Sequence, residues 1–255
     1  KLPPEAVVFF TGENTWREYP KWPPARAKPI NMYLSAQGKL TDKAPTAAKA
    51  SDTYVSNPLR PVPYYGKPSS RIDRNFMSAD QRFAHRRPDV VHYESDVLTT
   101  DGTRAGPLTA KIAFDTTGTD ADLVVKIIDI FPEDTRRPRS KKDPNPAFMG
   151  GYQHLVRAEA LRTRYRNGWD KPKPWTPRKT ETVTLKLPDV AHTFRKGHRI
   201  AVQIQSSWFP FIDANPQKFV NVFTAKEEDF IEAEHRVHRS KALPSRIEAV
   251  GWMGL

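Results

Sequence analysis

The chain of 255 residues contains no cysteine. This absence excludes disulfide bonds, thiol catalysis and thiolate metal sites, and it leaves the redox compartment open because a cysteine-free protein is stable in either one. Long apolar runs are missing too. None approaches the roughly 20 residues that a membrane-spanning helix needs, so we expect no membrane partner. The sequence also shows no internal repeat and no low-complexity tract.

The pattern that marks a catalytic serine is absent as well. No Gly-x-Ser-x-Gly segment occurs, which is the arrangement that exposes a nucleophile on a sharp strand-to-helix turn. Ser206 and Ser207 follow a strand-like segment without a glycine-bounded turn, so we interpret them as packing residues at a strand end. We therefore expect no catalytic residue, no cofactor site and no metal site within this chain.

Positive charge and proline are what the chain has in excess. The net charge is +12, and 24 residues are proline, nearly twice the average usage of about 5%. The basic residues are interleaved with acids, and the densest run lies in a proline-rich loop: Arg136, Arg137, Arg139, Lys141 and Lys142. Net charge reports on solubility and association rather than on fold, so we interpret this run as a solvated loop and expect no nucleic-acid partner. Binding to DNA that weakens steeply with salt would instead indicate a nucleic-acid partner.

The most informative segment runs from Gly197 to Gln217 (GHRIAVQIQSSWFPFIDANPQ). Ile200, Val202 and Ile204 alternate with polar or small residues, which is the period-two pattern of a half-buried strand. An aromatic loop follows, and Pro210 ends the pairing because it has no N–H donor. His198 lies in the turn before the strand, and we expect it to hydrogen-bond a neighbouring loop.

Similar segments occur along most of the chain and predict an all-β protein. In the segment LTAKIAFD, Leu108, Ala110, Ile112 and Phe114 share one face. The segment 152–165 fits a helix or a strand, and its context favours a strand. We expect Pro188 to end a strand at 181–187, a helical turn or two over 227–235, and an edge strand at 245–250. The other expected strands are 31–36, 53–56, 90–95, 123–131 and 194–205. Eight to ten strands with long connections indicate a jelly-roll β-sandwich.

The first 25 residues have a different composition. Ala6 to Phe10 (AVVFF) is wholly apolar, which is typical of a parallel-sheet strand buried on both faces. The next stretch, TWREYPKWPPA, is interpreted as a linker packed on a surface. We therefore divide the chain into residues 1–25, an end segment of another domain, and residues 26–255, the β-sandwich. Because it starts with Lys1, we interpret the chain as a piece of a longer polypeptide.

Two groups of side chains contain atoms that can bind metal ions. Four acids flank one expected strand: Asp115, Asp120, Asp122 and Asp129. Their carboxylate oxygens are ligands of the kind that calcium binds. We favour the interpretation that they lie in hairpin turns and hydrogen-bond their own backbone. His235 and His238 offer two imidazoles without the further ligands that a zinc site requires, so we interpret them as surface residues.

Two aromatic loops suggest a binding surface. The first loop contains Trp16, Tyr19 and Trp22, and the second contains Trp208, Phe209 and Phe211. Such rings stack on sugars in carbohydrate-binding modules. They also anchor interfaces between domains, because they cover a large apolar area, and we favour this second interpretation.

The order and spacing of several segments resemble one family of serine hydrolases. The chain is similar to the C-terminal region of the X-prolyl dipeptidyl aminopeptidase, cocaine esterase and α-amino acid ester hydrolase (glutaryl acylase) family over essentially all its length. The MGGYQ and DANPQ forms look nearer to the α-amino acid ester hydrolases. The matching segments are FFTGENTWREYPKWPP, YVSNPLRPVPY, ADQRFAHRRPDVVHYES, TDADLVVKIIDIFPE, MGGYQHLVRAEALRTRYRN, LPDVAHTFRKGHRIAVQIQSSWFPFIDANPQ and HRVHRS.

This resemblance implies a galactose-binding-like jelly roll that follows an α/β-hydrolase domain. It implies that Ala6 to Phe10 is a remnant strand of the hydrolase sheet, and that the catalytic Ser, Asp and His lie upstream of the matched segments. No catalytic residue can be carried over, so whether the chain is itself an enzyme stays open, whereas the parent would be a serine hydrolase. Related enzymes form oligomers, so a homo-oligomer is implied.

The resemblance also suggests residues that line a substrate pocket. In the family, the loop before the ADQR segment lends apolar side chains to the acyl pocket. Here that loop is SSRIDRNFMSADQ, which differs from cocaine esterase in length and sequence. Ile72, Phe76 and Met77 are the candidates by position.

Two functions follow from these observations. The first is an accessory β-sandwich of a serine hydrolase that cleaves ester or amide bonds of acyl, α-amino acyl or X-Pro dipeptidyl substrates, where it shapes the pocket and supports assembly. The alternative is a carbohydrate-binding jelly-roll module. The apolar strand Ala6 to Phe10 favours the first, because a free module has no use for it. The sequence indicates neither the exact substrate nor the compartment.

Overall fold

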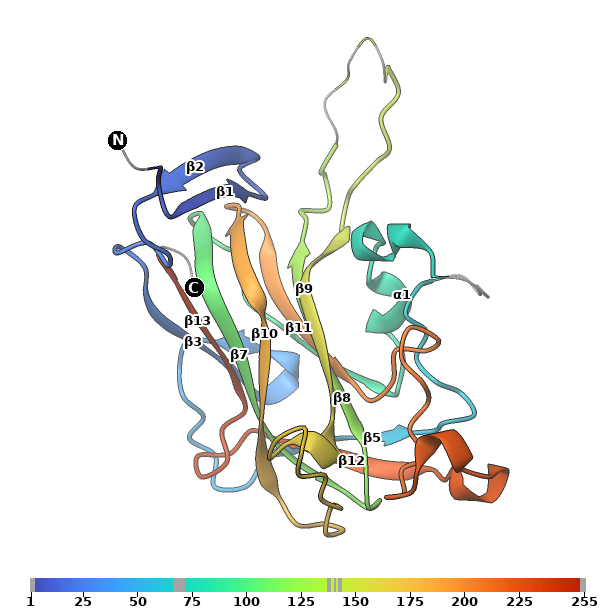
Figure 1. Cartoon of the computed structure of the whole chain (residues 1–255). Coiled ribbons are helices and arrows are strands. Elements are labelled where there is room, and N and C mark those ends of the chain that lie inside the picture. Colours follow the sequence, from blue (N-terminus) through green and yellow to red (C-terminus); the bar gives the residue numbers. More distant parts are fainter. Residues whose placement is uncertain (1–2, 67–71, 137–138, 140, 142–143, 253–255) are drawn as a thin grey trace.

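The computed structural model describes residues 3–66, 72–136, 139, 141 and 144–252. Within these residues the chain forms two packed antiparallel sheets with short helical turns in the connections (Figure 1). No helix among them is long and apolar enough to cross a bilayer. Arg137 and Lys142 of the basic run lie outside the described residues.

The larger sheet is organised around one long strand, β7 (Gly102–Thr116). β7 pairs with β10 (Glu181–Phe194) on one side, and with β13 and β12 on the other. The sheet order is β4-β3-β13-β7-β12-β5, with β10 joined to β7. The remaining bounds are β3 Lys28–Leu34, β4 Leu40–Thr41, β5 Ser51–Ser56, β12 Ala233–His238 and β13 Arg246–Trp252.

The smaller sheet has the order β6-β11-β8-β9. Its strands are β6 (Val90–Glu94), β8 (Asp122–Ile130), β9 (Gln153–Arg162) and β11 (Arg199–Gln205). All four pair antiparallel, so the ambiguous segment 152–165 contains a strand, as its context indicated. The predicted β-sandwich is confirmed.

The core lies between the two sheets and follows the predicted alternation. The inward residues of β7 pack in one buried cluster with those of β8 and β11. Burial of a large aliphatic side chain stabilises a fold by about 1.5–3 kcal/mol, so this cluster provides the main driving force for sandwich formation. Its central members are Leu108, Ile112, Phe114, Leu123, Val125, Ile127, Ile200, Val202 and Ile204.

Two expectations about strand ends and edges were wrong. Pro188 does not end its strand, because β10 continues to Phe194 through a register shift between Leu187 and Val190. The last strand, β13, is not an edge strand, since it lies between β3 and β7. Of the helical turn or two expected over 227–235, one is present, the 3₁₀ turn Glu227–Asp229, and β12 begins soon after it at Ala233.

The N-terminal segment forms a hairpin of its own. β1 (Ala6–Phe10) pairs antiparallel with β2 (Thr15–Tyr19), which corrects the interpretation of residues 15–19 as a linker. The exposure of β1 alternates along the strand, unlike that of a strand buried on both faces, and its partner within the chain is not parallel. The assignment of β1 to a preceding hydrolase sheet stays a prediction.

The hairpin is attached to the end of β10 in the larger sheet (Figure 1). The amide of Thr11 donates to Ala191, and the amide of Thr193 donates to Thr11. Gly12 follows with a φ of +83°, and a Cβ atom at this position would overlap the carbonyl of Thr193. Glycine is therefore required where the hairpin meets the sandwich.

Substitution of Gly12 by alanine is expected to loosen this attachment by about 2 kcal/mol, from the steric overlap and the positive φ. Hydrogen exchange of the β1 and β2 amides should become faster, while exchange in β7 and β8 stays unchanged. Gly66→Ala is a matched control, because its added Cβ would lie at an ordinary 3.4 Å from Phe83. Unchanged exchange in the hairpin would contradict the expectation.

Candidate functional site

An apolar groove of about 500 Å³ lies beside β9. One wall comes from the 3₁₀ turn Arg74–Ser78, which carries Phe76 and Met77. The loop after β11 contributes Trp208 and Phe211, and the floor includes Leu155 and Ala158 of β9. Thr11, at the end of β1, also lines the groove, so the groove adjoins the N-terminal hairpin.

Aromatic contacts hold the two walls together. The Phe76 ring lies 5.8 Å from Trp208 in an edge-to-face arrangement and 5.0 Å from Phe211. The hydroxyl of Tyr64 accepts a hydrogen bond from the amide of Asp73, whose carboxylate caps the 3₁₀ turn by accepting from the Asn75 amide. The position of Phe76 is therefore fixed by packing and by backbone hydrogen bonds.

The structure brings two of the three predicted pocket residues together. Phe76 and Met77 line the groove, and Met77 is 62% exposed at its rim. Ile72 is 61% exposed and does not line the groove. A role for any of the three in a substrate pocket stays a prediction.

A second apolar surface lies on the N-terminal hairpin. Trp16 is 67% exposed and Val7 54%, and the rings of Phe9 and Trp16 pack 5.4 Å apart. The opposite face is buried, because Phe10 packs against Tyr19, Trp22 and Trp252 in a small cluster. A contiguous exposed apolar patch of this kind is typical of an interaction surface. Trp208, by contrast, is only 6% exposed, which does not suit a ring that stacks on a sugar.

A buried hydrogen-bond network holds the aromatic loop from behind. Ser206 bonds Tyr54 and the Nδ1 of His235, each over 2.7 Å, and the Nε2 of His235 bonds Gln217 over 3.2 Å. The network crosses from β5 and β12 to both ends of the loop 206–217. His235 is completely buried rather than on the surface as predicted, and burial lowers its pKa to about 3. Ser206 has the structural role that the sequence indicated.

Among the described residues, one lysine is fully buried, and it lies behind the groove. Lys126 of β8 is completely buried, and its Nζ donates to Oε1 of Gln81 over 3.1 Å. The ammonium group also lies 5.4 Å from the centre of the Phe83 ring and 5.6 Å from that of Trp208. Burial lowers the pKa of Lys126 to about 7.

Each of the four acids that flank β8 contacts an arginine or a histidine side chain rather than only its own backbone. Asp120 binds Arg164 and Asp122 binds Arg162. Asp129 lies between His192 and His198, at 3.2 and 2.8 Å. The carbonyl of His198 also accepts from the amide of Leu98 in the loop after β6, so the expected bond to a neighbouring loop is confirmed, and its side chain in addition bonds β8. Asp115 contacts His238 and Arg178.

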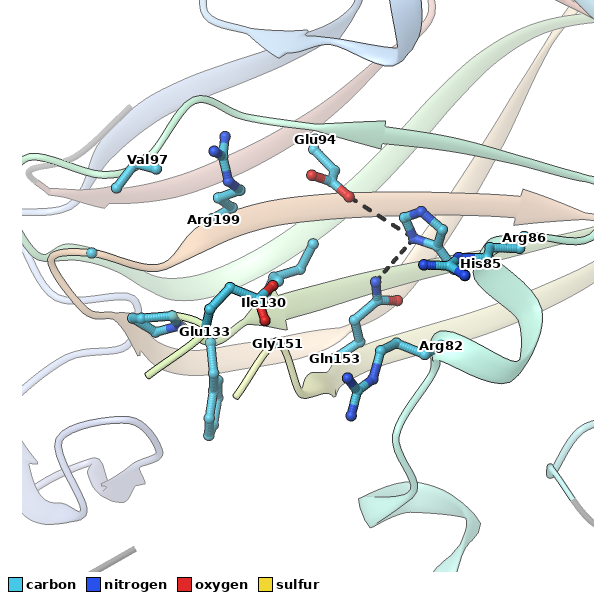
Figure 2. A pocket seen from close by; sticks show the side chains of 13 residues that line it. Arg82, His85, Arg86, Glu94, Val97, Ile130, Glu133, Gly151, Gln153 and Arg199 are labelled. Carbon is cyan, nitrogen blue, oxygen red and sulfur yellow. Dashed lines mark hydrogen bonds and ion pairs between the residues drawn. The ribbon is translucent and has the colours of Figure 1, made fainter. Parts of the chain in front are cut away.

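A larger polar pocket of about 770 Å³ lies on another part of the sandwich, between α1 (Arg82–His85) and the β8–β9 connection. Figure 2 shows His85 pointing toward Glu94 of β6 and Gln153 of β9. Burial, and then the nearby His92, lower the pKa of His85. The hydrogen bond from His92 lowers the pKa of Glu94.

None of these pocket residues was predicted from the sequence. The pattern His92-x-Glu94 on one strand was the available signal, since alternate residues of a strand point to the same side. Nothing in the sequence alone placed His85 beside them.

Comparison with known proteins identifies the family. The model of the X-Pro dipeptidyl-peptidase C-terminal non-catalytic domain matches residues 1–248. The cocaine esterase of Rhodococcus sp. (strain MB1 Bresler) is 26% identical over 252 residues, which cover 96% of this chain and 41% of the esterase.

Two solved structures are closely similar. An aminopeptidase from a marine sediment archaeon, Thaumarchaeota archaeon, is 38% identical with a TM-score of 0.89, over 97% of this chain and 40% of its own. An α-amino acid ester hydrolase is also 38% identical, with a TM-score of 0.87, over 96% of this chain and 41% of its own. The chain thus spans about two fifths of the length of these relatives, and it belongs to the family of X-Pro dipeptidyl-peptidase C-terminal non-catalytic domains.

Proposed function

We propose that this chain is the C-terminal accessory domain of a serine hydrolase that cleaves ester or amide bonds. In this proposal the domain packs on an upstream α/β-hydrolase domain that carries the catalytic triad. Phe76 and Met77, with Ile72 nearby, form part of the wall of the acyl pocket. The bond cleaved is an acyl, α-amino acyl or X-Pro dipeptidyl bond.

The continuity of two apolar surfaces carries this proposal. Thr11 connects the groove of Phe76 and Met77 to the hairpin whose outer face exposes Val7 and Trp16. A partner that covers the hairpin would therefore reach the mouth of the groove. Large exposed aromatic residues at such a junction favour burial against a protein surface.

The relatives support the same assignment. The similar chains are a cocaine esterase, an aminopeptidase and an α-amino acid ester hydrolase, and each is more than twice as long as the matched region. The residues of this chain that the structure describes form a sandwich with no parallel hydrolase sheet. Residues 1–25 would be the boundary segment and residues 26–255 the accessory domain. Assembly of the parent into a homo-oligomer stays a prediction.

Phe76→Ala in the full-length hydrolase is expected to change substrate preference more than folding. Loss of one aromatic ring from a pocket wall should shift the ratio of kcat/KM for large and small acyl groups by about tenfold. The ratio is measured with a series of esters that differ only in acyl size.

Phe223→Ala is the matched control, because Phe223 is 92% exposed and does not line the groove. It should leave the ratio unchanged. An equal loss of activity on large and small acyl groups in Phe76→Ala would exclude a role for this ring in selectivity, and a hydrolase that stays fully active after removal of the whole domain would overturn the accessory role.

A further inference from the structure

Three potential metal ligands meet at the edge of the polar pocket. They are His85, His92 and Glu94, and one donor atom from each lies within 4.8 Å of the others. The Nε2 of His92 is 2.8 Å from Oε1 of Glu94, and the Nδ1 of His85 is 3.9 Å from the same oxygen. The centres of the two imidazole rings are only 3.9 Å apart. Among the described residues, no other three histidine, aspartate or glutamate side chains bring their donor atoms this close together.

These separations suit a tetrahedral metal ion. Metal–ligand bonds of about 2.0–2.2 Å at tetrahedral angles place neighbouring ligand atoms about 3.3 Å apart. The distances from Oε1 of Glu94 to the two imidazole nitrogens, 2.8 and 3.9 Å, lie on either side of this value. Small side-chain rotations would therefore bring the three ligands around one ion.

The environment of His92 permits such a rotation. Its Nδ1 is buried and has no hydrogen-bond partner in the described part of the chain. Turning the ring toward an ion would exchange only the bond to Glu94, which would itself become a metal ligand. His85 would exchange the donor amide of Gln153, 2.9 Å away, for the ion.

Two of the three ligands, His85 and Glu94, line the polar pocket, and Figure 2 shows them turned toward one another there. Two histidines and one carboxylate leave the fourth position of a tetrahedral ion unfilled, as in open zinc sites. Arg86 and Arg199 line the same pocket, and Arg82, also in its wall, is paired with Asp80. Glu133 also lines the pocket, but the arginines outnumber it, so the surroundings favour an anion, such as chloride or a carboxylate, as the fourth ligand.

We propose that His85, His92 and Glu94 form a binding site for one divalent transition-metal ion of the zinc class, with the fourth position open to the pocket. Imidazole nitrogen and carboxylate oxygen are ligands that suit Zn²⁺, whereas Ca²⁺ requires six to eight oxygens. The proposal is independent of the hydrolase assignment.

The site would connect two separate elements. His85 ends the short helix α1, and the other two ligands lie on β6, which pairs with β11 in the sandwich. A bound ion would thus fasten the segment 80–87 to the smaller sheet. This segment directly follows the turn that carries Phe76 and Met77.

Titration of the full chain with ZnCl₂ tests the proposal. One ion per chain should bind, the thermal midpoint should rise, and X-ray absorption of the zinc-loaded protein should show two imidazole ligands. His85→Gln and Glu94→Gln should each weaken binding at least tenfold, because each removes a direct ligand. His154→Gln is the matched control, since this histidine lies on β9, outside the cluster, and lines the apolar groove.

Absence of zinc binding by the unaltered chain would overturn the proposal. So would an affinity that is unchanged in both Gln variants, or an equal loss in His154→Gln. If a variant fails to fold, the absorption spectrum of the unaltered chain still decides, because fewer than two imidazoles at the ion would exclude this site.

Discussion

The free energy of unfolding is expected to fall as the pH drops from about 6.5 toward 3, and His235 should account for much of the loss. Burial lowers the pKa of this histidine to about 3, against 6.5 for an exposed imidazole. In this interval the unfolded state binds a proton that the folded state excludes, so the free energy of unfolding decreases as the pH falls. A pKa shift of this size corresponds to a decrease in the free energy of unfolding on the order of 4 kcal/mol.

The hydrogen-bond network explains why a second proton on His235 is excluded. The amide oxygen of Gln217 only accepts, so Nε2 of His235 carries the proton. The Nδ1 then accepts from the hydroxyl of Ser206, which accepts in turn from Tyr54. A proton on Nδ1 would point at the Ser206 hydroxyl and reverse this chain without access to water.

His235→Gln is the informative variant. Glutamine retains a donor and an acceptor but does not titrate, so the variant should lose less stability than the natural chain between pH 6.5 and 3. Urea unfolding at a series of pH values measures the difference. Parallel curves for the two proteins would show that His235 does not contribute to acid sensitivity.

The features that the sequence predicted well are those set by local alternation. Ile200, Val202 and Ile204, like Leu108 and Phe114, lie on the inner faces because a period of two leaves each strand only one apolar side. The loop that carries Phe76 and Met77 was located by resemblance, and packing against Trp208 then placed both residues in one groove.

The features that the sequence missed depend on tertiary partners. Pro188 looked like a strand end, but the register shift between Leu187 and Val190 accommodates it within β10. His235 looked exposed because of its charged neighbours, yet Arg236 and Glu234 point to the other side of the same strand. Nothing local encodes the approach of His85 to Glu94, which lie on different elements.

Lys126→Met is expected to stabilise the chain at pH 7 and below by about 2 kcal/mol. A buried ammonium group pays a desolvation cost that one hydrogen bond to Gln81 and two ring contacts offset only in part. Methionine fills a similar volume without a charge and adapts to irregular space. The lost bond to Gln81 reduces the gain but does not reverse it.

The pH dependence distinguishes this mechanism from a packing effect. Burial lowers the pKa of Lys126 from 10.5 to about 7. Below pH 7 both states are protonated and the penalty is constant; between pH 7 and 10.5 the unfolded state binds more protons, so the stability of the natural chain rises with pH. At about 1.36 kcal/mol per pH unit, an advantage of about 2 kcal/mol for Lys126→Met should be lost near pH 8.5 and reversed at higher pH.

Lys111→Met provides the control, because Lys111 on β7 is partly exposed and pairs with Glu248 over 3.0 Å. An exposed pair of this kind contributes about 0–1 kcal/mol, so its loss should produce a small destabilisation at every pH below 10. Denaturant unfolding at pH 6, 8 and 10 separates the two variants. A Lys126→Met chain that is less stable at pH 6 would mean that the ammonium group is stabilised by its surroundings, and that the aromatic rings of Phe83 and Trp208 offset its desolvation in full.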